Sequence, residues 1–118
     1  MLYQYRKDYE KITMGLLSLI TEFPNMDLVE QEMDWYAQAD NRVIFLWKSE
    51  SNNWAGLLGV EELDSQVVIH QLLLTPQNQS QQSCNQMLNE LAEHYGKKQI
   101  VGSFSTHSIL KSWEQSKK

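Results

Sequence analysis

Residues 66–95 read QVVIHQLLLTPQNQSQQSCNQMLNELAEHY, and this stretch decides the fold. Its first part, Gln66–Leu74, is an apolar run typical of a strand, and Pro76 ends it. A neutral polar turn follows. From about Ser83 to Tyr95, apolar residues recur with helical spacing and form one continuous stripe. The stretch therefore predicts a strand that leads through a polar loop to a helix N-terminus, where free amides and the helix dipole favour an anion.

Composition predicts an ordinary globular protein of one domain. The chain has 118 residues, of which 42% are hydrophobic and 21% are charged, as expected for a soluble protein with one core. The net charge of −5 disfavours nucleic acid or an anionic membrane as a partner. No apolar window is long enough for a membrane span, and the first residues lack an apolar core, so we expect no secretory signal. Cys84 is the single cysteine, and no Cys/His cluster has zinc-site spacing, so we expect a cytoplasmic protein without a metal.

Hydrophobic periodicity divides the whole chain into short elements. Asp8 is a plausible N-cap for the first helix, and Gly96 is expected to end the third helix. We expect helices at Asp8–Ile20, Asp27–Gln38, Ser83–Tyr95 and Thr106–Gln115, and strands at Met1–Arg6, Val43–Trp47, Trp54–Val60, Gln66–Leu74 and Ile100–Phe104. The order is β-α-α-β-β-β-α-β-α, with the last two strands parallel through a crossover helix.

This order of elements resembles the GNAT acyltransferase family. The family's central motif is an apolar strand with a Val-x-Pro-like end, and then a Gln/Arg-x-x-Gly-x-Gly/Ala loop that leads into a helix. Here the matching residues are Leu72–Pro76 and Gln79–Cys84. Within the family, the chain is similar to the short RibT-type members encoded in riboflavin-biosynthesis operons, through Tyr5–Ser18, Phe45–Lys48 and Gly59–Glu61. The resemblance implies one α/β (α+β) domain over residues 1–118, with a mixed central sheet of about five strands flanked by helices.

The resemblance also implies an acetyl-CoA site. In this family the coenzyme lies where the strand corresponding to Gln66–Leu74 separates from the next parallel strand, here Ile100–Phe104. Main-chain groups of two leucines on the first strand would face the pantetheine arm, and amides around the start of the following helix would meet the pyrophosphate. The residues implied to bind the coenzyme are Leu72, Leu74, Gln79, Ser80, Gln81, Gln82, Ser83, Cys84 and Asn85.

The loop departs from the family pattern in ways that bear on coenzyme binding. Gln82 stands where the family has its first loop glycine, and Cys84 stands where it has Gly or Ala. Glycine permits φ > 0 and leaves room for phosphate oxygens. Residues 77–86 also contain no Lys or Arg, so the charge-assisted hydrogen bonds that hold polyanions are missing. We therefore expect acetyl-CoA binding to be weak or lost.

Two hypotheses about function follow from these observations. The first is an acetyl-CoA-dependent N-acetyltransferase that acts on a small-molecule or protein amine. The second is a noncatalytic binding or assembly protein with a degenerate coenzyme loop. The order of elements and the anion-ready helix favour the first, whereas the glycine-free loop favours the second.

Candidates for the general base lie on the two central strands. Amine acetylation needs a base, and some family members carry a Glu at the position of Val68. His70 shares the face of Val68 and can relay a proton near neutral pH. Glu61 and Glu62 are adjacent in a strand and point to opposite sides, so at most one faces a cleft. A histidine with a structural hydrogen bond and a solvated pair of glutamates are the simpler alternatives.

Candidates for other roles are weaker. Many family members use a Tyr on the last helix as general acid, but this region has none; Trp113 lies there, and an indole N–H is not a usable acid. His107 is a further candidate near the start of that helix. Cys84 lies on an apolar stripe, which indicates a buried thiol rather than a nucleophile. The aromatic side chains of Trp35, Trp47 and Trp54 are expected in the core.

The family usually adds a hairpin after the last helix, whereas only Ser116-Lys117-Lys118 follows here. Without that hairpin, the edge of the strand Ile100–Phe104 would need cover. A homodimer is one way to supply it.

Overall fold

The computed structural model describes residues 1–116, so Lys117 and Lys118 lie outside the described residues. Its elements follow the predicted order, with two short 3₁₀ helices added. They are β1 (Leu2–Gln4), η1 (Lys7–Tyr9), α1 (Glu10–Leu17), α2 (Met26–Ala37), β2 (Arg42–Lys48), β3 (Trp54–Glu62), β4 (Gln66–Leu74), η2 (Pro76–Asn78), α3 (Gln81–Tyr95), β5 (Gln99–Gly102) and α4 (His107–Ser116).

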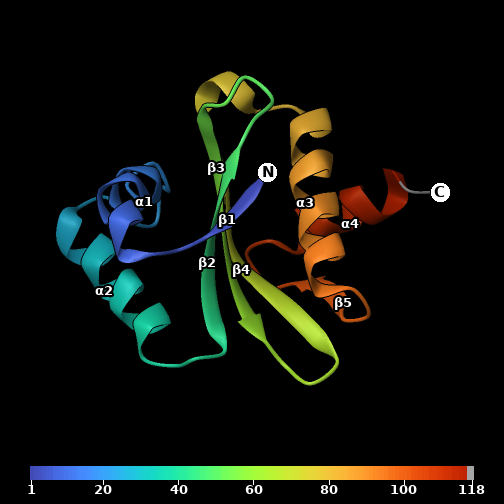
Figure 1. Cartoon of the computed structure of the whole chain (residues 1–118), viewed down its shortest axis with the longest axis horizontal. Coiled ribbons are helices and arrows are strands. Elements are labelled where there is room, and N and C mark those ends of the chain that lie inside the picture. The colour runs from blue at the N-terminus through green and yellow to red at the C-terminus, as the bar shows by residue number, and fades with distance from the viewer. Residues whose placement is uncertain (117–118) are drawn as a thin grey trace.

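The five strands form one mixed sheet in the order β1-β2-β3-β4-β5. Neighbours from β1 to β4 are antiparallel, whereas β4 and β5 are parallel and are connected through α3. Helices α1 and α2 cover one face of the sheet, and α3 and α4 lie on the other (Figure 1). The predicted fold class, sheet and crossover connection are therefore confirmed.

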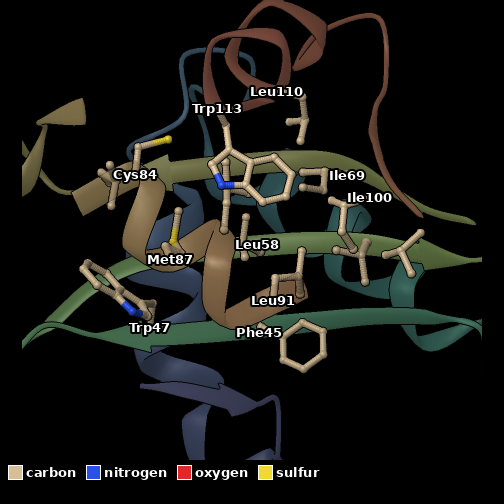
Figure 2. Packing of buried hydrophobic residues seen from close by; sticks show 14 of the residues in the cluster. Phe45, Trp47, Leu58, Ile69, Cys84, Met87, Leu91, Ile100, Leu110 and Trp113 are labelled. Atoms are coloured by element: carbon tan, nitrogen blue, oxygen red, sulfur yellow. The ribbon is translucent and has the colours of Figure 1, made fainter. Parts of the chain in front are cut away.

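The sheet buries both of its faces. On one face, the α3-side core packs strand residues such as Phe45, Leu58 and Ile69 against Met87 and Leu91 of α3 (Figure 2). The α2-side core lies on the other face and contains Leu16, Leu17, Val29, Tyr36, Ile44, Leu46 and Leu57. Burial on both faces explains why β2 reads as a continuous apolar run instead of an alternating one.

Two predicted helix features of the N-terminal part are wrong. Asp8 does not cap a helix, because it lies inside η1 and its carboxylate accepts a hydrogen bond from Arg6 at 2.7 Å. The residue at the N-cap of α1 is Tyr9. The helix predicted at Asp8–Ile20 is also too long, because α1 ends at Leu17 and Leu19 beyond it is exposed.

The predicted strand Ile100–Phe104 is also too long at its C-terminal end. β5 stops at Gly102, and Phe104 is fully exposed. Backbone packing accounts for the early stop, because a Cβ at Gly102 would lie 2.9 Å from the Cα of His107. The chain turns at Gly102 into α4, so apolar character at Phe104 does not extend the strand.

A bulge in β4 sets the direction of its side chains. Gly59 pairs with Gln71 and Val60 pairs with Ile69, so β4 has one more residue, His70, than β3. An extra residue changes the alternation of side chains between the two faces. As a result, His70 and Gln71 both project toward α2, where they contact Trp35 and Tyr36.

Within residues 1–116, no helix has the length and apolarity needed to cross a membrane.

Candidate active site

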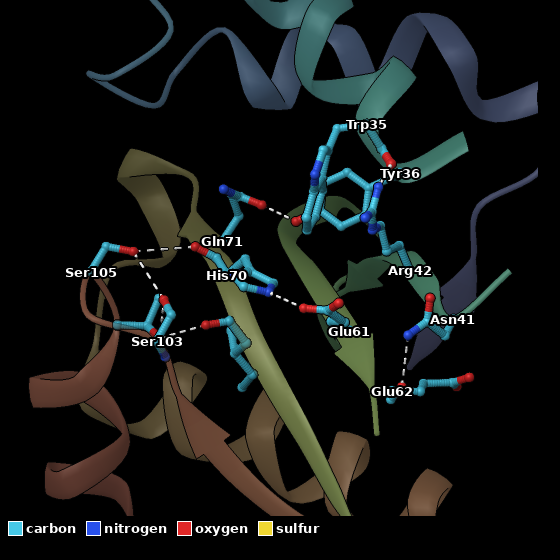
Figure 3. Close-up of polar contacts among 12 residues, drawn as sticks. Trp35, Tyr36, Asn41, Arg42, Glu61, Glu62, His70, Gln71, Ser103 and Ser105 are labelled. Atoms are coloured by element: carbon cyan, nitrogen blue, oxygen red, sulfur yellow. Dashed lines mark hydrogen bonds and ion pairs between the residues drawn. The ribbon is translucent and has the colours of Figure 1, made fainter. Parts of the chain in front are cut away.

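β4 and β5 separate at the level of the bulge. Their pairing ends where Ile69 meets Gly102. The turn after β5 then bonds back to β4: Ser103 N and Thr106 Oγ1 donate to the Ile69 carbonyl at 3.1 and 2.7 Å, and Ser105 Oγ donates to the His70 carbonyl at 3.3 Å (Figure 3). Beyond His70, this edge of β4 has no paired strand among the described residues.

A cleft of about 470 Å³ lies beyond this separation, and we call it the splay cleft. The end of β4, the turn into α3 and one face of α4 line it. The ten lining residues are Leu72, Leu73, Leu74, Gln79, Ser80, Gln81, Cys84, Ser108, Ile109 and Ser112. Six of the nine predicted coenzyme residues are among them, whereas Gln82, Ser83 and Asn85 are not. None of the ten carries a positive charge.

The start of α3 uses several of its own amides. The Ser80 hydroxyl accepts from the Ser83 amide at 3.0 Å, and the Ser80 carbonyl accepts from the Cys84 amide at 3.0 Å. The helix also begins earlier than predicted, so Asn85 lies inside its first turns. The Ser83 and Cys84 amides are therefore already bonded within the helix start. The first two helical amides, those of Gln81 and Gln82, are the ones that a helix N-terminus leaves for an acceptor.

Gln82 does not close the splay cleft. It is exposed and helical, and Asn52 is the one non-glycine residue with positive φ in the described chain. A glycine at position 82 is therefore not required by the backbone conformation. A main-chain acceptor at the cleft is instead occupied by Gln79, whose side-chain amide donates to the Leu74 carbonyl at 3.2 Å.

Cys84 is a buried thiol, as predicted from its place on the apolar stripe. It is 7% exposed and packs in the α3-side core. Burial raises the pKa of the thiol, and a raised pKa reduces the thiolate that a nucleophile needs.

The splay cleft continues into two further hollows on the α2 side of β4. Leu72 and Ile109 line both the splay cleft and a middle cavity of about 160 Å³. Four residues of the middle cavity also line a third hollow of about 360 Å³, the α2 cavity; they are Glu22, Phe23, His70 and Gln71. The α2 cavity is completed by Leu28, Gln31, Glu32 and Trp35. The three hollows are therefore adjacent and share wall residues, and we refer to them together as the channel.

His70 and Glu61 meet beside this channel. His70 Nε2 lies 3.0 Å from Glu61 Oε1, and the two side chains are 28% and 27% exposed. The ring of Trp35 meets the imidazole edge to face at 5.2 Å (Figure 3). An ionised carboxylate only accepts hydrogen bonds, so Nε2 carries the proton and Nδ1 is the nitrogen that can receive another.

The neighbouring Glu62 is on the other face of the sheet. Its carboxylate lies near Tyr95 of α3, and burial together with this charge raises the pKa of the Tyr95 hydroxyl. The two adjacent glutamates therefore point apart, as strand geometry requires, and only Glu61 approaches His70.

A second polar group lies next to His70. The Tyr36 hydroxyl donates to Gln71 Oε1, and Gly59 leaves the space that this hydroxyl fills. Burial raises the pKa of the Glu32 carboxyl, and the charge of His70 and a hydrogen bond from Gln71 oppose this rise only in part. Gln71 thus links Tyr36 to Glu32 at the wall of the channel.

Sequence reasoning missed part of the channel. Trp35 was expected in the core, yet it is half-buried and lines the α2 cavity. Ser108, Ile109 and Ser112 have the spacing of one helical face, which could have indicated that α4 faces a cleft. Trp113 and His107 do not line the channel; Trp113 is buried and its indole donates to Asn89 Oδ1 at 2.9 Å.

The bulged and separated β4, followed by α3, gives the fold of an N-acetyltransferase. An aminoglycoside 6′-N-acetyltransferase from Acinetobacter baumannii has this fold, with a TM-score of 0.68 at 9% identity over 98% of this chain and 87% of that one. A second aminoglycoside 6′-N-acetyltransferase, in complex with the bisubstrate analogue CoA-S-monomethyl-acetylneamine, gives 0.70 at 13% identity over 98% and 87% of the two chains. A chimera of spermidine N-acetyltransferase from Vibrio cholerae gives 0.68 at 13% identity over 98% and 78%.

Sequence similarity identifies the family. An uncharacterized N-acetyltransferase of Bacillus methanolicus is 31% identical over 115 residues, which cover 97% of this chain and 95% of that protein. No protein-family model matches the chain. The protein belongs to the GNAT family of N-acetyltransferases.

Proposed function

We propose that the protein is an acetyl-CoA-dependent N-acetyltransferase that acetylates a primary amine. The observation that carries this proposal is the position of the splay cleft next to the middle cavity, which His70 lines with Glu61 bonded behind it. Further support comes from an enzyme of the same fold, the second aminoglycoside acetyltransferase, which binds a CoA-containing bisubstrate analogue.

In this proposal the splay cleft holds acetyl-CoA through main-chain groups of β4 and α3. The His70 carbonyl faces the turn after β5, and alternate residues of a strand direct their main-chain groups to the same side. Main-chain groups of Leu72 and Leu74 would then hold the pantetheine arm, with the Leu74 carbonyl shared with Gln79. The amides of Gln81 and Gln82 would hold the pyrophosphate at the helix N-terminus. When bound there, the coenzyme supplies the acetyl thioester.

His70 serves as the general base in this proposal. The reaction forms the C–N bond of the amide and breaks the C–S bond of the thioester. The proton of the attacking ammonium group moves to Nδ1 of His70, while Glu61 holds the proton on Nε2 and fixes the ring. No tyrosine lines the splay cleft or the middle cavity in the described part of the chain, so we propose that the leaving thiolate takes its proton from water.

We propose that the affinity for acetyl-CoA is low for this family. Ten residues line the splay cleft and none is Lys or Arg. Hydrogen bonds from neutral donors to phosphate are roughly half as strong as charge-assisted ones. The two helix amides are therefore the main source of attraction for the pyrophosphate.

Calorimetric titration with acetyl-CoA tests the site, with desulfo-CoA and ATP as comparison ligands. We expect saturable binding of both CoA ligands and weaker binding of ATP, which lacks the pantetheine arm. Ser112→Trp should abolish binding, because an indole on this face of α4 fills the cleft. Glu114→Trp is the matched control, since Glu114 is exposed on the same helix and outside the cleft, and it should bind normally.

Absence of heat at millimolar acetyl-CoA would overturn the enzyme proposal. That result would favour the alternative of a noncatalytic binding or assembly protein. Equal binding by the Ser112→Trp variant and the parent protein would place the coenzyme outside the splay cleft.

We also propose a connection with riboflavin biosynthesis. Its support is the similarity of Tyr5–Ser18 and Phe45–Lys48 to RibT-type proteins. Deleting the gene from its natural host should lower the riboflavin content of the cells, and His70→Ala expressed in that strain should not restore it. An unchanged riboflavin content after deletion would contradict the connection.

A further inference from the structure

The α2 cavity contains carboxylates that no lysine or arginine neutralises within residues 1–116. Glu22 and Glu32 line it, and Glu61 lies behind His70. Neither Glu22 nor Glu32 forms an ion pair with a lysine or arginine within residues 1–116. The remaining polar lining is neutral, from Gln31 and Gln71.

Arg42 is close in space but is held elsewhere. Its guanidinium stacks on the Trp35 ring, with Cζ 4.1 Å from the ring centroid, and Nη1 donates to the Trp35 carbonyl at 2.9 Å. Arg42 does not line the α2 cavity. The Arg42 guanidinium is therefore directed to the backbone and ring of Trp35. The carboxylates of Glu22 and Glu32 can attract a cationic ligand.

The cavity also offers apolar surface in addition to its carboxylates. Phe23 and Leu28 come from the α1–α2 turn and the start of α2, and Trp35 comes from the next part of α2. These side chains can cover a short aliphatic chain. The combined middle and α2 cavities, of about 160 and 360 Å³, have the size of small-molecule sites.

We infer that the acceptor is a small aliphatic diamine or polyamine. One amino group reacts at His70, and a second ammonium group is bound by Glu22 and Glu32, which line the same α2 cavity. Methylene groups between the two nitrogens pack on Phe23 and Trp35. This inference rests on the proposed function, because it names the acceptor of the same reaction.

Charge and burial explain why a second ammonium group would decide affinity. Glu32 is partly withdrawn from water, and it lies beside Gln71 in the wall of the cavity. A hydrogen-bonded ion pair in such a place is stronger than an exposed one. A monoamine of equal length would leave both carboxylates without a cation and gain only the apolar contact. The net charge of −5 also attracts cationic ligands to the protein.

Steady-state rates with matched pairs of amines test this inference. At saturating acetyl-CoA, we expect kcat/KM for 1,4-diaminobutane and spermidine to exceed that for n-butylamine roughly tenfold or more, the range of a good charge-assisted pair. Glu32→Gln and Glu22→Gln should each reduce this preference, mainly through KM of the diamine. Glu30→Gln is the matched control on α2, because Glu30 is exposed and does not line the cavity; it should keep the preference.

The outcomes separate this inference from the proposed function. If the protein acetylates n-butylamine as well as 1,4-diaminobutane, the diamine inference is overturned while the transferase stands. Retention of the full preference in both Glu→Gln variants would also overturn it. If acetyl-CoA does not bind, calorimetric titration of the coenzyme-free protein with spermidine still decides: loss of binding in Glu32→Gln but not in Glu30→Gln supports the acidic site, and no binding to the parent protein overturns it.

Discussion

Replacement of His70 by alanine is expected to lower kcat/KM for acetyl transfer by roughly 10²- to 10⁴-fold, the usual contribution of a positioned general base. His70 lines the middle and α2 cavities and bonds to Glu61 at 3.0 Å, so its loss removes the proton acceptor from the channel. Acetyl-CoA affinity should change little, because His70 does not line the splay cleft.

Chemical rescue distinguishes a base from a structural histidine. Added imidazole should restore part of the rate of His70→Ala, since the vacated space can hold a small base. Glu61→Gln should show a smaller loss, because a neutral amide still holds the ring but no longer favours its protonated form. His94→Asn is the matched control: His94 is exposed on α3 and packs on Phe45, away from the channel. Full activity of His70→Ala would refute the assignment of the base.

Gly59→Ala is expected to lower the free energy of unfolding by about 1–3 kcal/mol, the typical cost of overpacking. A Cβ at Gly59 would overlap the Tyr36 hydroxyl and would lie 2.9 Å from Gln71 Oε1. Tyr36 is 5% exposed and belongs to the α2-side core, so moving its ring disturbs that packing. Thermal or urea unfolding followed by circular dichroism measures the change.

A double variant and a matched glycine control test the cause of this loss. Tyr36→Phe removes the overlapping hydroxyl, so Gly59→Ala should cost less in a Tyr36→Phe background, and the two changes should be non-additive. Gly15→Ala is the control, because no atom lies within 4 Å of its Cβ and alanine favours the interior of α1 by roughly 0.5–1 kcal/mol. Equal costs of Gly59→Ala in both backgrounds would show that Tyr36 is not the obstacle.

The strands and helices were predictable wherever local pattern and burial agree. β4 has the predicted bounds Gln66–Leu74, and α3 starts two residues before the predicted Ser83. Errors occurred at chain ends and turns, where a neighbouring segment decides the boundary. Asp8 has a side chain suited to an N-cap, but a 3₁₀ turn places it elsewhere, and Phe104 is apolar but follows a sharp turn at Gly102.

The candidate site was predictable only as separate parts. His70 and Glu61 were identified by residue type, but their contact depends on the bulge in β4, which has no signature in the sequence QVVIHQLLL. Glu22 and Trp35 were not associated with the site, because the α1–α2 turn and α2 bring them to β4 only in the folded chain. The family pattern predicted that Gln82, in place of a loop glycine, would weaken coenzyme binding. Because Gln82 has an ordinary helical backbone, glycine is not needed there for its conformational freedom.

The sequence by itself determined the order of elements, the two apolar faces of the sheet, the polar turn into α3 and the lack of positive charge in that turn. These properties depend on hydrophobic period and composition, which are local. The tertiary structure decided which polar side chains meet. One extra residue in β4 turns His70 and Gln71 to the same face, and the packing of α2 brings Trp35 and Glu32 to them. Such contacts depend on register and on distant segments, so no local pattern of residues specifies them.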